Sequence, residues 1–243
     1  MFKKRWFTDL LADMKISKTV LITGSSKGLG EALSQIFATH SYDIILHGRD
    51  TLKLEEIKKR ILDKGVECDV VVGDLLHDDT LAQLAELSGS RNLDILINNA
   101  ATYLRKPFAE TSADEIRRIL NVNLVAPILL TSKIFPIFER KKNGLIININ
   151  SFAGKNSGED ESIYCASKHG LKGFSGSLQF DANRNGVRVV DAYLGAMNTQ
   201  MVKGRKDVEK CIDTSEAAML IYNLCEDCKS VRITEVDLLR RWY

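Results

Sequence analysis

Two residues near the start of an expected long helix, Tyr164 and Lys168, have the types and the spacing to do acid–base chemistry. Residues four apart on a helix lie on one face, one turn from each other. A cation beside a phenol favours the phenolate and lowers the phenol pKa, which allows a tyrosine to act as a general acid or base near neutral pH. The alternative is a half-buried tyrosine beside a solvated lysine, so the rest of the chain has to supply the other parts of a site.

The elements that would position this pair alternate regularly along the chain. Short apolar runs predict strands over 19–23, 43–47, 66–72, 93–97, 145–151, 187–193 and 231–238. Helices are expected over 29–39, 52–64, 78–87, 112–142, 162–183 and 215–225. Strands that alternate with helices are typical of a parallel sheet covered on both faces. We therefore expect a single doubly wound, Rossmann-like α/β domain over 18–243, with a seven-stranded parallel sheet and helices on both faces.

Composition and charge narrow the class of protein. The 243 residues are 44% hydrophobic and 27% charged, as in an ordinary globular protein. The net charge of only +2 gives no argument for a nucleic-acid partner, and no apolar run suggests a transmembrane segment. Five scattered cysteines indicate reduced thiols and a cytoplasmic location. The pair Cys225 and Cys228 has no second pair or nearby histidine, so no metal site is expected.

Residues 1–17 form an extension before the alternating pattern. Apolar side chains recur at every fourth position, which predicts an amphipathic helix over 2–14: Phe2, Trp6, Leu10 and Met14. Such a helix would pack on the domain or on another subunit. A contact with a membrane surface through the basic residues at 3–5 is the alternative.

A glycine-rich turn follows the first expected strand and opens the first expected helix. Its sequence is TGSSKGLG over 23–30, with the pattern Gly-x-x-x-Gly-x-Gly. Glycines let a turn tighten and let the backbone approach a pyrophosphate, and a helix N-terminus offers free N–H groups. In this position the turn predicts dinucleotide binding, with an ordinary turn as the alternative.

Taken together, these motifs resemble the short-chain dehydrogenase/reductase family. The turn at 23–30, Asn98-Asn99-Ala100, Ser151 and the Tyr164/Lys168 pair occur in the order of that family and at its approximate spacings, over about 18–238. Within the family the chain looks similar to the 3-oxoacyl-carrier-protein reductases. The resemblance implies an NAD(P)-dependent oxidoreductase that interconverts a carbonyl and a secondary alcohol of a small molecule by hydride transfer.

The resemblance also assigns catalytic roles. It makes Tyr164 the acid/base, with Lys168 lowering its pKa and binding the nicotinamide ribose, and it makes Ser151 the group that orients the carbonyl oxygen. It also implies that the backbone carbonyl of Asn123 binds a water molecule that belongs to the proton relay. The sequence adds that Pro127, four residues later, has no N–H to pair with that carbonyl.

The cofactor site follows by the same resemblance. Tyr164 and Lys168 would share the dinucleotide with Gly24, Ser26, Lys27, Gly28, Leu29, Gly30, Arg49, Asp74, Leu75, Asn98, Ala100, Gly195 and Thr199. An acidic residue usually ends the second strand when the ribose 2′-hydroxyl is free, but here Gly48 aligns with it. The nearby cations Lys27 and Arg49 suit a 2′-phosphate. NADPH is therefore favoured; NADH remains open, because Asp50 would weaken the argument if it turned inward.

Several segments depart from the family pattern or remain open to two interpretations. Leu194 stands where the family has proline, which puts the rigidity of the following loop in doubt. The segment 200–213 is short for a substrate lid and basic, which suggests an anionic substrate such as a nucleotide sugar, a phosphate ester or a carrier-protein thioester; a solvated loop is the alternative. The acidic run at 159–161 is interpreted as a solvated helix entry.

Two expectations concern the whole protein. By resemblance, a homodimer or homotetramer would form through the two long helices. A non-catalytic dinucleotide-binding regulator or scaffold on the same fold is the rival to an enzyme. The complete set of Asn123, Ser151, Tyr164 and Lys168 favours the enzyme.

Overall fold

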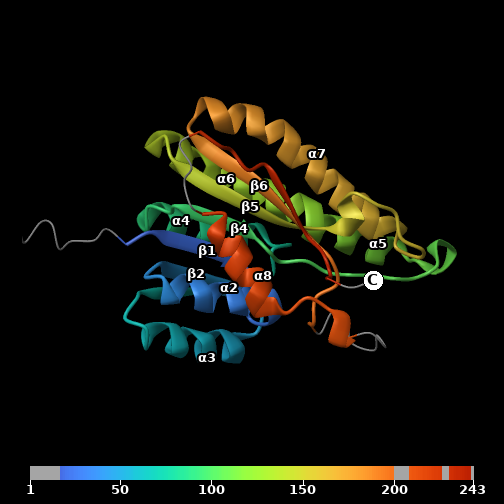
Figure 1. Cartoon of the computed structure of the whole chain (residues 1–243), viewed down its shortest axis with the longest axis horizontal. Helices are drawn as coiled ribbons and strands as arrows, with labels where there is room; N and C mark the ends of the chain where they lie inside the picture. The colour runs from blue at the N-terminus through green and yellow to red at the C-terminus, as the bar shows by residue number, and fades with distance from the viewer. Residues whose placement is uncertain (1–16, 200–207, 226–229, 242–243) are drawn as a thin grey trace, which may run out of the picture.

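The computed structural model describes residues 17–199, 208–225 and 230–241 (Figure 1). The expected helix at 2–14 lies outside these ranges, as does most of the basic segment 200–213. The extension at 1–17 is therefore described only at its last residue.

A single parallel sheet of seven strands forms the centre of the fold and confirms the expected class. Its strand order is β3-β2-β1-β4-β5-β6-β7. The strands are β1 (Thr19–Thr23), β2 (Asp43–Gly48), β3 (Cys68–Val72), β4 (Ile95–Asn98), β5 (Gly144–Ser151), β6 (Val187–Leu194) and β7 (Glu235–Leu238). The last strand is shorter than the expected 231–238, because β7 pairs only with the second half of β6, from Asp191 to Leu194.

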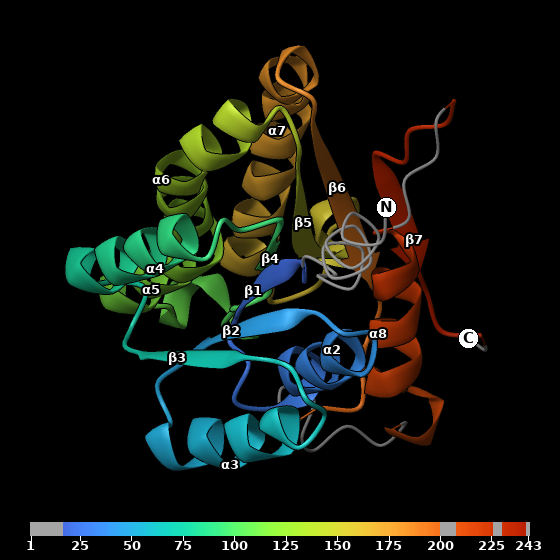
Figure 2. The same cartoon turned by 90° about the vertical axis from the view of Figure 1, so that its left-hand side faces the viewer.

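Helices cover both faces of the sheet, as Figure 2 shows. One face carries α2 (Gly28–Thr39), α3 (Thr51–Leu62) and α8 (Thr214–Asn223). The other carries α4 (Asp78–Ser90), α5 (Ala113–Leu120), α6 (Ala126–Lys141) and α7 (Ser162–Arg184). Short 3₁₀ turns lie at η1 (Phe108–Glu110), η3 (Phe152–Gly154) and η5 (Val208–Lys210).

The strands read as continuous apolar runs because both of their faces are buried. In β1, Val20 and Ile22 belong to the apolar cluster under α2, α3 and α8, whereas Leu21 belongs to the cluster under α4, α6 and α7. Successive side chains of a strand point to opposite faces, so a strand between two helical layers needs apolar residues at every position.

The long helical region expected at 112–142 is interrupted at its centre. Ser112 caps α5 in a reciprocal capping box with Glu115, and five residues of π-helix (η2, Asn121–Val125) then lead into α6. The N–H of Ala126 donates to the carbonyl of Asn121, five residues earlier. Pro127, the second residue of α6, has no N–H and thus cannot continue regular α-helical bonding across this point.

The stretch Ala113–Lys141 is long and apolar enough to cross a membrane by length and composition, which differs from the expectation above. Its apolar side chains Leu130, Ile134 and Phe138 are fully buried against the sheet. In all, 39% of its most apolar window is buried, and a single helix of this kind is weak evidence for a membrane span because core helices pass the same test.

Candidate active site

A cavity of about 1630 Å³ opens at the carboxyl ends of the strands. It lies where the strand order reverses between β1 and β4, the position at which open α/β sheets bind ligands. Most of the residues assigned above to catalysis or cofactor binding line it. They are Gly24, Ser26, Lys27, Gly28, Leu29, Gly30, Arg49, Asp74, Leu75, Ala100, Ser151, Tyr164, Lys168, Gly195 and Thr199.

The glycine-rich turn forms a cradle that side chains would fill. Gly24 and Gly28 have φ of +69° and +57°, in the left-handed region that favours glycine. A Cβ on Gly30 would lie 2.2 Å from the carbonyl oxygen of Gly24, and one on Gly24 would lie 2.9 Å from Cα of Ala100. Helix α2 begins at Gly28, so the free N–H groups of its first turn lie in the wall of the cavity. The residues present therefore fit the pyrophosphate of a dinucleotide.

At the end of β2, the structure brings two predicted cofactor residues together. Nη1 of Arg49 lies 3.2 Å from Oδ2 of Asp74, and the Arg49 side chain is 63% exposed. Oδ1 of Asp50 instead accepts the N–H of Lys53 and caps α3. Asp50 does not line the cavity, so the carboxylate that could have argued for a free 2′-hydroxyl is turned away from it.

His47, a residue not expected from the sequence to take part in the site, connects the glycine-rich turn to the loop that follows β3. Its Nδ1 accepts the N–H of Gly24 at 3.4 Å, and its Nε2 lies 3.2 Å from the carbonyl oxygen of Gly73. Burial lowers the pKa of His47 to about 4, against the opposing effect of the bond to Gly73. The neutral ring thus donates from Nε2 and accepts at Nδ1, and it ties two loops of the cofactor site together.

We expect this buried histidine to make the protein sensitive to acid. The folded-state pKa of His47 lies below the unfolded value of 6.5, so the unfolded chain binds more protons and stability is lost as the pH falls from 6.5 towards 4. At about 1.4 kcal/mol per pKa unit, the shift is worth about 3 kcal/mol. Urea unfolding at pH 7 and pH 4.5 should show a loss for the wild type that is about 2.5 kcal/mol larger than for His47→Gln. His40→Gln, which removes an exposed imidazole, is the control, and an equal loss in all three proteins would contradict this account.

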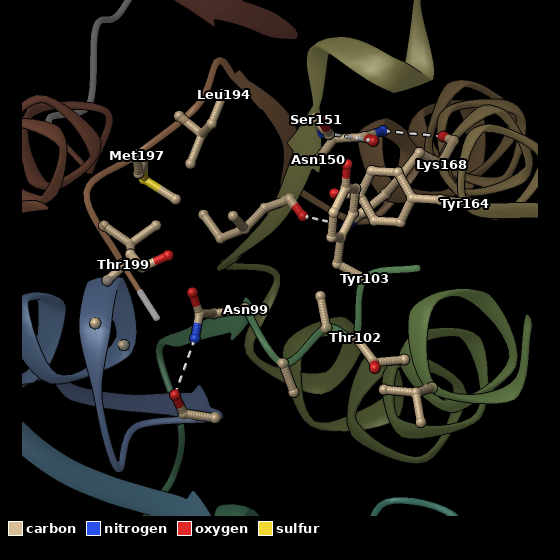
Figure 3. Close-up of a pocket in the computed structure, with 18 of the residues that line it drawn as sticks. Asn99, Thr102, Tyr103, Asn150, Ser151, Tyr164, Lys168, Leu194, Met197 and Thr199 are labelled. Carbon is tan, nitrogen blue, oxygen red and sulfur yellow. Dashed lines mark hydrogen bonds between the residues drawn. The ribbon is translucent and has the colours of Figure 1, made fainter. Parts of the chain in front are cut away.

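At the opposite end of the cavity, Ser151, Tyr164 and Lys168 come together (Figure 3). Tyr164 is only 8% exposed. Burial raises the pKa of its phenol, a hydrogen bond with Ser151 lowers it, and the charge of Glu161 raises it further. The net direction is upward, which differs from the lowering expected from Lys168 alone, because loss of hydration is the largest effect.

The ammonium group of Lys168 is held by the backbone of β5. Its Nζ donates to the carbonyl oxygen of Ile149 at 2.9 Å. Burial lowers the pKa of Lys168 to about 8, whereas the charge of Asp191 raises it. In this arrangement the lysine contacts the strand that ends at Ser151.

The two remaining predicted residues lie behind the wall of the cavity. Oδ1 of Asn123 accepts the N–H of Thr102 at 2.8 Å, and its Nδ2 donates to the carbonyl of Thr102 and to Oγ of Ser167. Asn123 therefore fixes the start of the loop after β4 to α7. Asn98 lies in the core, where its Nδ2 donates to Oδ1 of Asn148 at 2.8 Å. Its neighbour Asn99 lines the cavity instead.

Tyr103 and Glu161 also line the cavity, and neither role was expected from the sequence. The Tyr103 ring meets the Tyr164 ring edge to face, with centroids 5.0 Å apart (Figure 3). The Tyr103 hydroxyl donates to the carboxylate of Glu161. The interpretation of the acidic run 159–161 as a solvated helix entry is therefore incomplete at Glu161, which is half-buried and accepts a bond from Tyr103.

The loop after β6 is tied by its backbone, although Leu194 stands in place of proline. The N–H of Gly195 donates to the carbonyl of Leu238 at 2.9 Å. Further along, Ile212 donates to Ala196 and accepts from Asn198, both at 2.9 Å. These bonds hold the wall that contains Gly195 and Thr199. Among the described parts of the chain, no group of three or more metal-ligating side chains occurs; Cys228 lies outside them.

Comparison with known proteins agrees with this geometry. The family described as "short chain dehydrogenase" matches residues 18–210. A mouse protein named dehydrogenase/reductase SDR family member 7 is 30% identical over 240 residues, which cover 90% of this chain and 71% of the mouse protein. An uncharacterised oxidoreductase of Staphylococcus saprophyticus is 26% identical over 91% of this chain and 96% of its own length.

Solved structures show the same relationship. A metagenomic short-chain oxidoreductase in complex with NADP superposes with a TM-score of 0.82 at 29% identity, covering 92% of this chain and 97% of the other. A short-chain dehydrogenase from Sphingobium yanoikuyae in complex with NADPH gives 0.79 at 26% identity, covering 90% and 87%. These matches agree with the fold, with the glycine cradle and with the cavity that brings Ser151, Tyr164 and Lys168 together. The chain therefore belongs to the short-chain dehydrogenase/reductase family of oxidoreductases.

Proposed function

We propose that the protein is an NADPH-preferring reductase that interconverts a carbonyl and a secondary alcohol, with Tyr164 as the acid/base. The observation that carries the proposal is that Tyr164, Ser151 and Lys168 line the same cavity as the glycine cradle. When bound, the nicotinamide dinucleotide supplies the hydride. The protein itself orients the carbonyl oxygen with Ser151 and moves a proton at Oη of Tyr164.

The buried position of Tyr164 suits the reducing direction. A raised phenol pKa keeps the hydroxyl protonated at neutral pH, so it is ready to donate to an oxygen that gains negative charge. Lys168 places a cation on the same face of α7 and stabilises the phenolate left after donation. Assay of the purified protein with NADPH against a panel of ketones and aldehydes tests the proposal, and it fails if no carbonyl compound supports NADPH oxidation.

The cofactor preference rests on Arg49. Its exposed guanidinium, paired with Asp74, lies at the end of β2 where Gly48 leaves room, and a guanidinium binds a phosphate in a fork geometry. Arg49→Ala should weaken NADPH binding about tenfold to thirtyfold, as expected for a charge-assisted bond, and leave NADH binding unchanged. Dissociation constants from fluorescence titration provide the measurement. Arg117→Ala, an exposed arginine outside the cavity, is the control; equal losses for both dinucleotides would contradict the preference.

For the substrate we propose an anionic carbonyl compound: a nucleotide sugar, a phosphate ester or a carrier-protein thioester, the last matching a 3-oxoacyl-carrier-protein reductase. Arg105 and Arg118 line the cavity and support this class, whereas most of the basic segment 200–213 lies outside the described residues. Turnover of matched charged and neutral ketones distinguishes the classes.

We further propose a homodimer or homotetramer formed through the two long helices. Exposed apolar side chains on η2, α6 and α7 support it: Val125, Leu129 and Phe180.

A further inference from the structure

The loop after β4 is joined to the entry of the catalytic helix by three contacts. The Tyr103 hydroxyl donates to the Glu161 carboxylate. The N–H of Lys106 donates to the carbonyl of Asp160 at 2.7 Å. Nη2 of Arg105 lies 3.7 Å from Oε2 of Glu159. Tyr103, Arg105 and Lys106 thus contact all three residues of the acidic run 159–161, beside the end of the cavity that holds Tyr164.

Among these contacts, the one between Tyr103 and Glu161 lies next to Tyr164, because Tyr103 also packs against the Tyr164 ring. The Tyr103 ring stands at 86° to the Tyr164 ring. Glu161 precedes Tyr164 by three residues at the start of α7, a spacing that brings two side chains to the same side of a helix. The Tyr103 ring therefore contacts the proposed acid/base, and the charge of Glu161, the N-cap of α7, acts on it.

The carboxylate of Glu161 is held in one place. Its Oε1 accepts from Tyr103, and its Oε2 lies against Gly158, where an added Cβ would come within 2.5 Å. Burial raises the pKa of Tyr103 above its ordinary value, so the hydroxyl remains a donor wherever Glu161 is ionised. Tyr103 and Gly158 thus position the negatively charged carboxylate of Glu161.

Polar and titratable groups on several elements surround the position of Tyr164. Ser151, at the end of β5, hydrogen-bonds the phenol. Lys168 and Cys165 share its helix, and the charge of Arg105 is opposed by Glu159. Glu161 is the carboxylate whose charge acts on the phenol. Its negative charge disfavours the phenolate.

We propose that Tyr103 and Glu161 are a positioning pair for Tyr164: the Tyr103 ring fixes the orientation of the phenol, and the seated Glu161 charge sets the pH range in which the phenol ionises. The inference rests on the proposed function, because it assigns the pair to the reaction of Tyr164. It extends the site beyond the serine, tyrosine, lysine and asparagine predicted from the sequence.

Glu161→Gln tests the charge alone, because glutamine keeps an acceptor for Tyr103. In alcohol oxidation, which needs the phenolate, the acidic limb of the kcat/KM profile should move to lower pH by about half to one unit. Tyr103→Phe keeps the ring contact but removes the bond; we expect a KM several-fold higher and a smaller shift of the limb. Glu110→Gln removes an exposed carboxylate from η1, outside the cavity, and should leave the profile in place.

A measurement without turnover separates this inference from the proposed function. In protein labelled with ¹³Cζ-tyrosine, the Tyr164 signal is identified by its loss in Tyr164→Phe and titrated in the wild type and in Glu161→Gln. A lower midpoint in Glu161→Gln supports the inference even if no substrate is turned over, in which case the proposed function fails alone. An unchanged midpoint, or a profile for Glu161→Gln that matches Glu110→Gln, overturns the inference while the proposed function stands.

Discussion

Replacing Tyr164 by phenylalanine should reduce kcat by about 10²- to 10⁴-fold, the range that general acid–base catalysis contributes. The change removes only the hydroxyl, and the ring can still meet Tyr103 edge to face. Dinucleotide binding should therefore remain, because the glycine cradle lies at the other end of the cavity. Steady-state kinetics with NADPH and a carbonyl compound, together with the NADPH dissociation constant, provide the measurement.

Tyr222→Phe is the matched control for this prediction. Tyr222 lies on α8, on the other face of the sheet, and its ring packs against Phe37 and His40. The variant makes the same chemical change outside the cavity and should keep the wild-type kcat. Full turnover by Tyr164→Phe would remove Tyr164 from the reaction and leave the hydride transfer without its proposed proton donor.

The second large effect is expected at the glycine cradle. Gly30→Ala places a methyl group 2.2 Å from the Gly24 carbonyl oxygen, a distance at which backbone has to move. The turn and the start of α2 would separate, and the N–H groups that face the pyrophosphate would lose their common direction. We expect the affinity for NADPH and for NADH to fall by at least about 100-fold, equivalent to about 2.7 kcal/mol.

Gly173→Ala is the control for this change. Gly173 lies within α7, and a Cβ there meets nothing within 4 Å. Alanine is favoured over glycine inside a helix by about 1 kcal/mol, so this variant should bind dinucleotide normally and unfold at a higher temperature. If Gly30→Ala binds NADPH as tightly as Gly173→Ala, the dinucleotide does not lie on the turn.

Much of the fold was predictable because local patterns and burial agree. A strand such as β1 is apolar throughout since helices cover both of its faces, and the turn after it has glycines where the backbone needs them. The interruption of the long helical region at 121–125 was harder to predict from the sequence. Pro127 signalled a lost N–H, but the five-residue π-helix at 121–125 depends on how Asn123 reaches Thr102 across the chain.

The site residues were predictable where their spacing along the sequence identifies them. Residues that join the site only through tertiary contacts were not. Tyr164 and Lys168 are recognisable because one helical turn separates them. Tyr103 stands in an irregular loop and has no periodicity, so its contact with Tyr164 leaves no trace in the sequence. His47 lies in an apolar strand and looks like an ordinary core residue.

The π-helix also determines how the two halves of the long helix are phased. Each residue of an α-helix advances by about 100°, so one extra residue rotates everything that follows by about that angle. The insertion lets Asn123 point towards Thr102 while Leu130, Ile134 and Phe138 point towards the sheet. Deleting a single residue from 121–125 would remove this extra advance and turn one of these two surfaces away from its partner, while Pro127 would still leave one backbone carbonyl without a helical donor. The rotation of α6 about its axis relative to α5 is therefore set by the one extra residue in the π-helix.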